Sequence, residues 1–389
     1  MKLPRFGVEE WLNVHEKNAK YDIAGVSIKS LTLDELFDLT NTSAATFYKE
    51  LGKTKLDYGW IEGSPGFKKS VSQLYRTIGP EHILQTNGAT GANFLALFSL
   101  IEPGDHIISL YPTYQQLYDI PKSLGAELEY WQIKEELNWL PDLDDLRQLI
   151  RPQTKMICLN NANNPTGAVM DDVFLKEVAT IAASVGAYVL VDEIYTSFSE
   201  NNNSSIVDLY ENGIAVNSLS KTYSLAGIRI GWVAANEKVI SILRDYRDYT
   251  LICAGVFDDM VARLALDNRQ AILKRNHRII HENLSILDHW VSMQPRASYI
   301  KPAFVSTSFV KLDVPIPIEE FSLNLLEKYG VLVVPGSRFE KEGYVRIGYA
   351  CDQETLKKGL ELLGNALAAY DESHCKSTRI EDPLTTHHK

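Results

Sequence analysis

The chain has 389 residues, of which 45% are hydrophobic, 23% charged and 10% aromatic, a composition typical of a folded globular protein of about two or three domains. This composition excludes disorder as the main state of the chain. The formal charge of −11 argues against a general attraction to nucleic acid or to an anionic membrane surface, so we expect neither as a partner.

Two further features indicate the cellular compartment. The first residues lack the apolar core of a signal peptide, and the longest apolar stretches, residues 94–101 and 185–191, fall far short of the ~20 residues that span a bilayer. The four cysteines lie far apart and form no CxxC pair, which fits a reducing compartment and gives no metal-binding pattern. We therefore expect a cytoplasmic protein without a metal site.

Helix and strand patterns alternate through the first two thirds of the chain. Ser64 followed by Pro65 predicts the start of a helix that runs to about residue 77. Helices are also predicted after residue 87 and over residues 113–124 and 171–185, with short apolar strands at residues 106–110, 155–160, 188–192, 214–218 and 228–235. Strands that alternate with helices predict an α/β fold with a mostly parallel sheet flanked by helices.

The character of the chain changes in its final third. Residues 236–289 read as helical, and strands are then predicted at residues 304–312, 331–334 and 344–349, with helices at residues 318–329 and 353–370. This mixture predicts a smaller α+β domain. Residues 371–389 are polar and show no periodicity, so we expect a disordered tail there.

Polar side chains gather where three of the predicted strands end. They are Asn164, Asp192, Tyr195, Ser218, Ser220, Lys221 and Arg229. Open α/β sheets bind ligands at the carboxyl ends of their strands, so these residues predict a site. A simpler interpretation is that Lys221 or Arg229 neutralises a buried Asp192, because a buried carboxylate is costly without a cation. That interpretation leaves the serines, the tyrosine and the asparagine unexplained.

The order of these segments resembles the signature of a known family. Asn-Pro-Thr-Gly at residues 164–167, Asp-Glu-x-Tyr at residues 192–195, Ser-x-x-Lys at residues 218–221 with Arg229 eight residues on, and Arg346 within Tyr-Val-Arg-Ile-Gly follow one another as in the class I/II aminotransferases. These are fold-type I enzymes that use pyridoxal 5'-phosphate. The resemblance covers roughly residues 20 to 370 and implies a large cofactor-binding domain and a small domain.

The resemblance implies catalytic roles for Lys221, Asp192 and Tyr195 and a cofactor-binding role for Asn164. Lys221 would form a Schiff base with the cofactor and then move the α-proton of the substrate, both of which need a neutral amine. Asp192 would keep the pyridine nitrogen protonated, which makes the cofactor an electron sink. Tyr195 and Asn164 would donate hydrogen bonds to the phenolic oxygen.

The resemblance also implies how the cofactor and the substrate are held. The cofactor phosphate would be bound by Ser218, Ser220, Arg229 and the start of the helix at Ala89 and Thr90. Tyr114 would lie against the cofactor ring, and Tyr58 would reach the phosphate of a neighbouring subunit, so that a homodimer shares its active sites. Arg346 would bind the substrate α-carboxylate, with Asn164 and Gly25 lining the substrate pocket.

The family resemblance also implies the domain boundaries. We expect residues 1–45 to contribute to the small domain and to the substrate pocket. Residues 46–285 would form the large cofactor-binding domain and residues 286–370 the small one.

Several reactions remain compatible with these parts. The family favours transfer of an amino group from an amino acid to a 2-oxo acid. Residues 9–12, 20–26 and 31–36 are also similar to the N-terminal region of capreomycidine synthase, so a lyase or a cyclase of that kind is the alternative. A binding or regulatory protein without catalysis is disfavoured because Lys221, Asp192 and Arg229 are all present. The sequence does not identify the amino donor.

Overall fold

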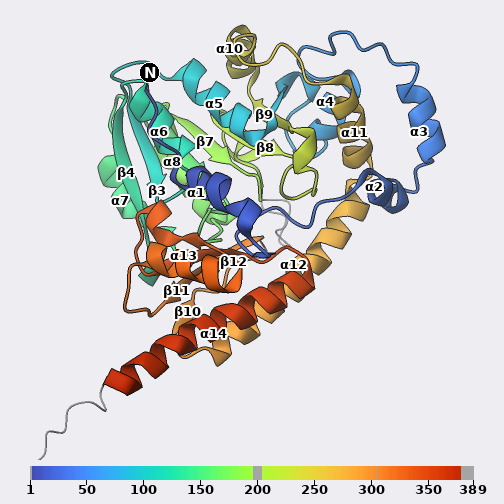
Figure 1. Ribbon diagram of the computed structural model, residues 1–389. Helices are drawn as coiled ribbons and strands as arrows, with labels where there is room; N and C mark the ends of the chain where they lie inside the picture. Colours follow the sequence, from blue (N-terminus) through green and yellow to red (C-terminus); the bar gives the residue numbers. More distant parts are fainter. Residues whose placement is uncertain (1, 196–203, 304, 378–389) are drawn as a thin grey trace, which may run out of the picture.

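The computed structural model describes residues 2–195, 204–303 and 305–377, and its largest feature is an eight-stranded sheet in the order β2-β9-β8-β7-β6-β3-β4-β5 (Figure 1). The strands are β2 (Ile83–Asn87), β3 (His106–Tyr111), β4 (Glu127–Lys134), β5 (Leu140–Pro141), β6 (Thr154–Asn160), β7 (Tyr188–Asp192), β8 (Gly213–Ser218) and β9 (Ile230–Ala235). The five strands from β8 to β4 are parallel, whereas β9 and β5 pair antiparallel with their neighbours. The predicted α/β fold is confirmed, with a sheet that is mixed at its edges.

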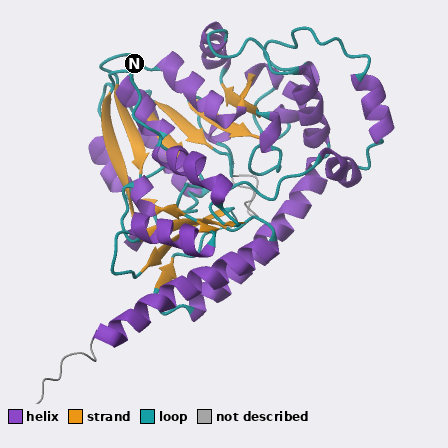
Figure 2. Ribbon diagram, viewed as in Figure 1, coloured by secondary structure: helices purple, strands orange, loops and turns teal. Residues whose placement is uncertain are grey.

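Helices cover both faces of this sheet, as Figure 2 shows. Alternate residues of β7 enter different cores: Val189 and Val191 pack in one, and Leu190 packs against α5 (Gly88–Leu100) in the other. Burial on both faces explains why the strand reads as a continuous apolar run. The remaining helices of this part are α4 (Pro65–Ser72), α6 (Gln116–Ser123), α7 (Leu143–Leu149), α8 (Asp172–Ala183), α9 (Ile206–Leu209), α10 (Glu237–Arg247) and α11 (Val256–Asp267).

A second, antiparallel sheet of four strands follows in the final third of the chain. It is built from β10 (Ala297–Tyr299), β11 (Thr307–Leu312), β13 (Val334–Pro335) and β14 (Tyr344–Gly348). The helices beside it are α12 (Arg269–Met293), α13 (Ile318–Tyr329) and α14 (Gln353–Ser377). A short parallel pair, β1 (Tyr21–Asp22) with β12 (Val331–Leu332), ties the N-terminal segment to this region.

The N-terminal segment contains three helices that the sequence analysis did not predict: α1 (Gly7–His15), α2 (Leu33–Thr40) and α3 (Ala44–Leu51). Trp11 fixes α1 in place, because its ring is 2% exposed and its Nε1 donates a 2.9 Å hydrogen bond to the carbonyl of Val333. This bond ties the helix to the chain between β12 and β13.

Some predicted boundaries need correction. The helix after Ser64 ends at Ser72 rather than near residue 77, although Ser64 caps it as expected through a 3.1 Å bond from the amide of Phe67. The predicted tail also starts too early, because α14 continues to Ser377. No glycine or proline interrupts residues 371–377, so nothing in the local sequence ends the helix. Residues 378–389 lie outside the described part.

No helix in the described part of the chain has both the length and the apolar character that crossing a bilayer requires. Within the same residues, no group of three or more His, Cys, Asp or Glu side chains is arranged to hold a metal ion.

Candidate active site

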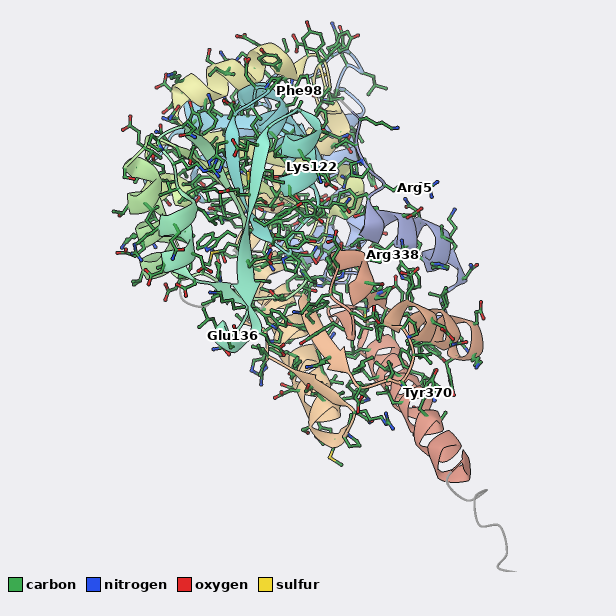
Figure 3. The ribbon with its side chains drawn as sticks, turned by 90° about the vertical axis from the view of Figure 1, so that its left-hand side faces the viewer. Arg5, Phe98, Lys122, Glu136, Arg338 and Tyr370 are labelled. Carbon is green, nitrogen blue, oxygen red and sulfur yellow. The ribbon has the colours of Figure 1, made fainter. Side chains whose placement is uncertain are left out.

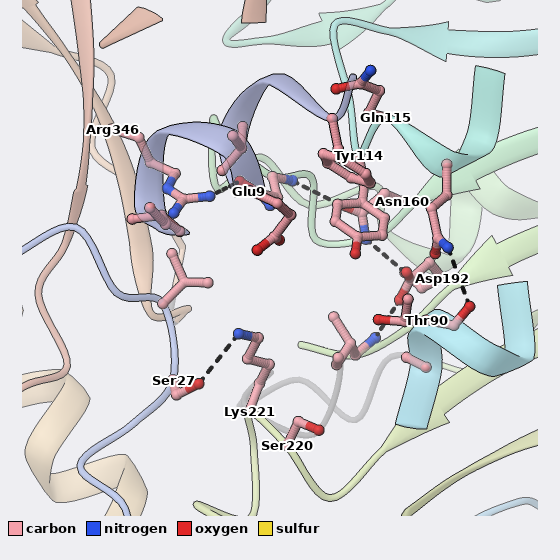
Figure 4. A pocket seen from close by; sticks show the side chains of 18 of the residues that line it. Glu9, Ser27, Thr90, Tyr114, Gln115, Asn160, Asp192, Ser220, Lys221 and Arg346 are labelled. Carbon is pink, nitrogen blue, oxygen red and sulfur yellow. Dashed lines mark hydrogen bonds between the residues drawn. The ribbon is translucent and has the colours of Figure 1, made fainter. Parts of the chain in front are cut away.

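Most of the predicted site residues line one cavity of about 600 Å³. It lies where β6, β7 and β8 end, since these strands are parallel neighbours and their carboxyl ends meet at one edge of the sheet. The predicted residues that line it are Gly25, Ala89, Thr90, Tyr114, Asn164, Asp192, Tyr195, Ser220, Lys221, Arg229 and Arg346. Figure 4 shows the cavity with Lys221 on one side and Asp192 and Thr90 on another.

Asp192 is the last residue of β7 and is 3% exposed. One carboxylate oxygen accepts a 2.7 Å hydrogen bond from Asn93 Nδ2, and the other accepts a 3.2 Å bond from the amide of Ile194. Burial raises the pKa of this carboxyl to about 6, while these two hydrogen bonds and the charge of Lys221 limit the rise. The carboxylate is therefore fixed in orientation and sensitive to any cation that approaches it.

Lys221 presents its amine to the same cavity. Its Nζ donates a 3.2 Å hydrogen bond to Ser27 Oγ, which comes from the N-terminal segment. Burial and, after it, the positive charge of Arg346 lower the pKa of the amine to about 8, although the carboxylate of Glu9 opposes the change. A substantial fraction of the amine is consequently neutral near pH 8, as a nucleophile or a base requires.

The start of α5 and the loop around Arg229 form a cradle for an anion. Gly88 has a φ of +67°, and a Cβ at this position would lie 2.8 Å from Arg229 Nη2, so glycine lets the guanidinium approach the helix start. Ala89, Thr90 and Ser220 line the cavity beside it. Amides at a helix N-terminus, hydroxyls and a guanidinium are the donors that bind phosphate.

Tyr114 and Tyr195 bring aromatic rings to the cavity. Burial raises the pKa of Tyr114 to about 12, and its hydroxyl is hydrogen-bonded to the side chain of Thr90. Tyr195 is 3% exposed, and burial raises the pKa of its hydroxyl, an effect that the charge of Arg346 opposes. Both hydroxyls are therefore protonated at neutral pH and can donate hydrogen bonds.

Arg346 projects from β14 and is almost fully buried. Its Nη1 donates a 3.2 Å hydrogen bond to Asn164 Oδ1, and its Nη2 donates a 2.9 Å bond to the carbonyl of Ala24. Its Nε is buried and has no partner among the described residues. A guanidinium held in this way can offer a planar fork to a carboxylate.

Two predicted residues are not among those that line the cavity. Ser218 is fully buried, and its Oγ accepts a 3.1 Å bond from the amide of Ser220, so its contact with a phosphate stays a prediction. Tyr58 is 76% exposed and lines no part of the cavity in its own chain.

Sequence reasoning missed several residues of the site. Asn93 contacts Asp192 from α5, Ser27 contacts Lys221, and Asn160 bonds the amide of Asn164 through a 2.8 Å contact. The only available signal for Asn93 was a single amide within an apolar helix. Glu9 was missed as a lining residue because α1 itself was not predicted.

Comparisons with known proteins agree with this geometry. Residues 31–363 match the family model of aminotransferase class I and II. A solved PLP-dependent aminotransferase from Streptococcus suis is 70% identical, with a TM-score of 0.94 over 95% of this chain and 99% of that one. Capreomycidine synthase from Streptomyces vinaceus is 28% identical over 97% of both chains. An aspartate aminotransferase from Pyrococcus horikoshii is 31% identical over 82% of this chain and 86% of its own length.

Proposed function

The chain belongs to the class I and II aminotransferase family, and on that premise we propose that it transfers an amino group from an amino acid to a 2-oxo acid in the cavity around Lys221. One observation carries the proposal. A partly neutral amine, a buried carboxylate and an anion cradle line the same cavity as a guanidinium with a free buried donor.

The cavity fits pyridoxal 5'-phosphate, the cofactor of this family. The absence of a side chain at Gly88 leaves room for the guanidinium of Arg229 beside the helix start, which suits the phosphate. Lys221 would hold the aldehyde end and Asp192 the ring nitrogen, while Tyr195 and Asn164 would donate to the ring oxygen. The phosphate would be held by Ala89, Thr90, Ser220 and Arg229, with Tyr114 against the ring.

Each side chain then has a defined task. When bound, the cofactor supplies an electron-withdrawing ring that stabilises negative charge on the substrate α-carbon. The Asp192 carboxylate, held by Asn93 and the Ile194 amide, would keep a proton on the ring nitrogen of the bound cofactor. Lys221 Nζ would take the α-proton from the substrate and deliver it to the cofactor carbon bonded to the substrate nitrogen, and Arg346 would orient the substrate by its α-carboxylate.

We propose further that the protein works as a homodimer. Exposed apolar side chains cluster on two segments that contact each other through a 3.2 Å bond from the amide of Gly59 to Cys253 Sγ. They include Leu56, Tyr58, Trp60, Ile61, Tyr249 and Ile252. An apolar surface of this kind favours burial against another chain, and a second copy would let Tyr58 complete the neighbour's anion cradle. Sedimentation should give the mass of two chains, and Tyr58→Phe should retain pyridoxal phosphate less well.

The domain boundaries and the location are proposed in the same way. Residues 46–285 would form the cofactor-binding domain and residues 286–370, with the first 45, the small one. The three described cysteines, Cys158, Cys253 and Cys351, are free thiols, which supports a cytoplasmic location.

A panel of amino acids added to the holoenzyme tests the reaction. Loss of the cofactor's imine absorbance together with release of a 2-oxo acid would support transamination. The second candidate is a lyase or cyclase reaction, favoured by the alignment with capreomycidine synthase across the N-terminal segment as well as the rest of the chain. Ammonia or a cyclic product without a 2-oxo acid would replace the first proposal by the second.

A further inference from the structure

One wall of the cavity is a single face of the N-terminal helix region. Glu9, Leu12, Asn13 and Glu16 line the cavity, and their spacing of three, four and seven residues places them on the same side of the helix. Figure 4 shows the Glu9 side chain between Arg346 and Tyr114, directed into the cavity. This wall carries two carboxylates and an amide.

These carboxylates are not neutralised by the protein. Within the described residues, neither Glu9 nor Glu16 forms an ion pair or a side-chain hydrogen bond. Glu10 differs, because it is not among the lining residues and it forms ion pairs with Arg5 and, at 3.2 Å, with Arg338. The two adjacent glutamates therefore differ: Glu10 is paired with arginines, whereas Glu9 lines the cavity and has no ion pair among the described residues.

The cations of the cavity already have partners or tasks. Arg338 is bound by Glu10 at 3.2 Å and by Glu319 at 2.6 Å, and it lies beside α1 (Figure 3). Arg346 is the fork for the α-carboxylate, Arg229 belongs to the anion cradle, and Lys221 is the reacting amine. Lys221, Arg229 and Arg346 form no ion pair among the described residues, but each has a task with cofactor or substrate. The charged groups of the cavity that are left without a task are the carboxylates of Glu9, on α1, and Glu16, directly after it.

Glu9 is close enough to the reacting groups to act on them. Its charge raises the pKa of Lys221 and opposes the effect of burial on Arg346. A substrate held by Arg346 at its carboxylate and by Lys221 at its amino end therefore lies within the electrostatic reach of Glu9. Its side chain is the one part of the substrate with no partner among the residues already assigned.

We propose that Glu9 selects amino donors with a cationic side chain, such as a guanidinium or an ammonium group, with Glu16 extending the acidic wall. This inference rests on the proposed function. A cationic group pairs with a carboxylate that would otherwise lose water without compensation when substrate fills the cavity. An anionic side chain, such as that of aspartate, would be repelled there.

The test compares L-arginine with L-citrulline, which has the same shape but a neutral urea group, using pyruvate as acceptor. We expect the wild-type holoenzyme to show a kcat/KM for arginine about tenfold or more above that for citrulline. Glu9→Gln should remove most of this ratio by lowering the arginine value and leave citrulline within about threefold. Glu10→Gln, which removes the same charge from the outer side of the helix, should keep the ratio.

A binding measurement separates this inference from the proposed function. Without acceptor, arginine should raise the thermal unfolding midpoint of the wild-type holoenzyme more than citrulline does, and Glu9→Gln should abolish the difference. A wild-type enzyme that treats the two alike, or a preference that survives Glu9→Gln, would overturn the inference. Failure of every donor to release a 2-oxo acid, with the binding difference intact, would overturn the proposed function and leave the selectivity of Glu9 standing.

Discussion

The strand-end side of the cavity and its α1 side are built in different ways. On the strand-end side Asp192 is almost fully buried, with both carboxylate oxygens hydrogen-bonded. On the α1 side, Glu9 and Glu16 are exposed and form no side-chain hydrogen bond with the described residues. A pre-organised frame suits the chemistry, which needs fixed angles, whereas unpaired side chains suit substrate selection, since they gain a partner only when the right substrate binds.

The largest effect is expected from Lys221→Ala. The variant should lose about a thousandfold or more of its turnover with every donor, because among the described residues no other lysine lines the cavity to move the α-proton. Turnover and the visible absorbance of the bound cofactor are the measurements. Lys238→Ala, an exposed lysine on α10, serves as the control. If Lys221→Ala kept its turnover, the strand-end side of the cavity would not be where the chemistry takes place, and the contrast with the α1 side would fail.

Arg346→Lys should be the next most damaging change. Lysine keeps the charge but loses the planar fork, so kcat/KM should fall by about a hundredfold for all donors, whatever their side chains. This uniform loss contrasts with the donor-specific loss expected of Glu9→Gln. Steady-state kinetics with arginine, citrulline and alanine would measure this loss. A loss confined to arginine would instead show that Arg346 selects the substrate side chain.

Asn93→Leu tests how the frame tunes Asp192. The pKa of Asp192 is about 6 in the folded protein, against an ordinary value of 3.8. At a pH between these two values, the folded protein keeps a proton on Asp192 that the unfolded chain has released. This carboxyl therefore lowers the free energy of unfolding of the cofactor-free protein as the pH rises through that window. Removing the 2.7 Å donor raises the pKa further, so the loss should extend to higher pH.

Urea unfolding at a series of pH values measures this shift, and retention of pyridoxal phosphate should fall about tenfold in Asn93→Leu. Asp192→Asn is the matched control, since it removes the titrating group and should flatten this part of the profile. An unshifted profile in Asn93→Leu would show that Asn93 does not set the charge of Asp192.

The two sides also differ in how far the sequence predicts them. Asp192 and Lys221 were predictable because the end of a parallel strand fixes where such residues lie, and the family signature adds their roles. Ser218 and Ser220 flank the same turn after β8, and of the two only Ser220 lines the cavity, whereas the Ser218 hydroxyl accepts a bond from the Ser220 amide. The turn geometry that decides between two nearby serines is set by packing rather than by local pattern.

The α1 side was missed for a related reason. The helix is held by the Trp11 contact with Val333, which joins residues 322 positions apart, and no periodicity within nine residues reveals such an anchor. Asn93 likewise contacts Asp192 across 99 positions. Local sequence patterns do not reveal long-range contacts of this kind. These contacts nevertheless determine which side chains face the cavity.

Ser27→Ala is expected to have the smallest effect. It tests whether Ser27, in the N-terminal segment, supports the reacting groups or takes part in substrate selection. Ser27 comes from the same segment as Gly25, yet it accepts a hydrogen bond from Lys221 Nζ at 3.2 Å, as a residue of the frame would. Loss of one such bond should lower kcat about three- to tenfold for all donors, without changing the ratio of arginine to citrulline. Ser27→Thr keeps the hydroxyl and should restore most of the rate. If Ser27→Ala instead changed the ratio of arginine to citrulline and left kcat unchanged, Ser27 would act in substrate selection. The whole N-terminal segment would then belong with the α1 side of the cavity.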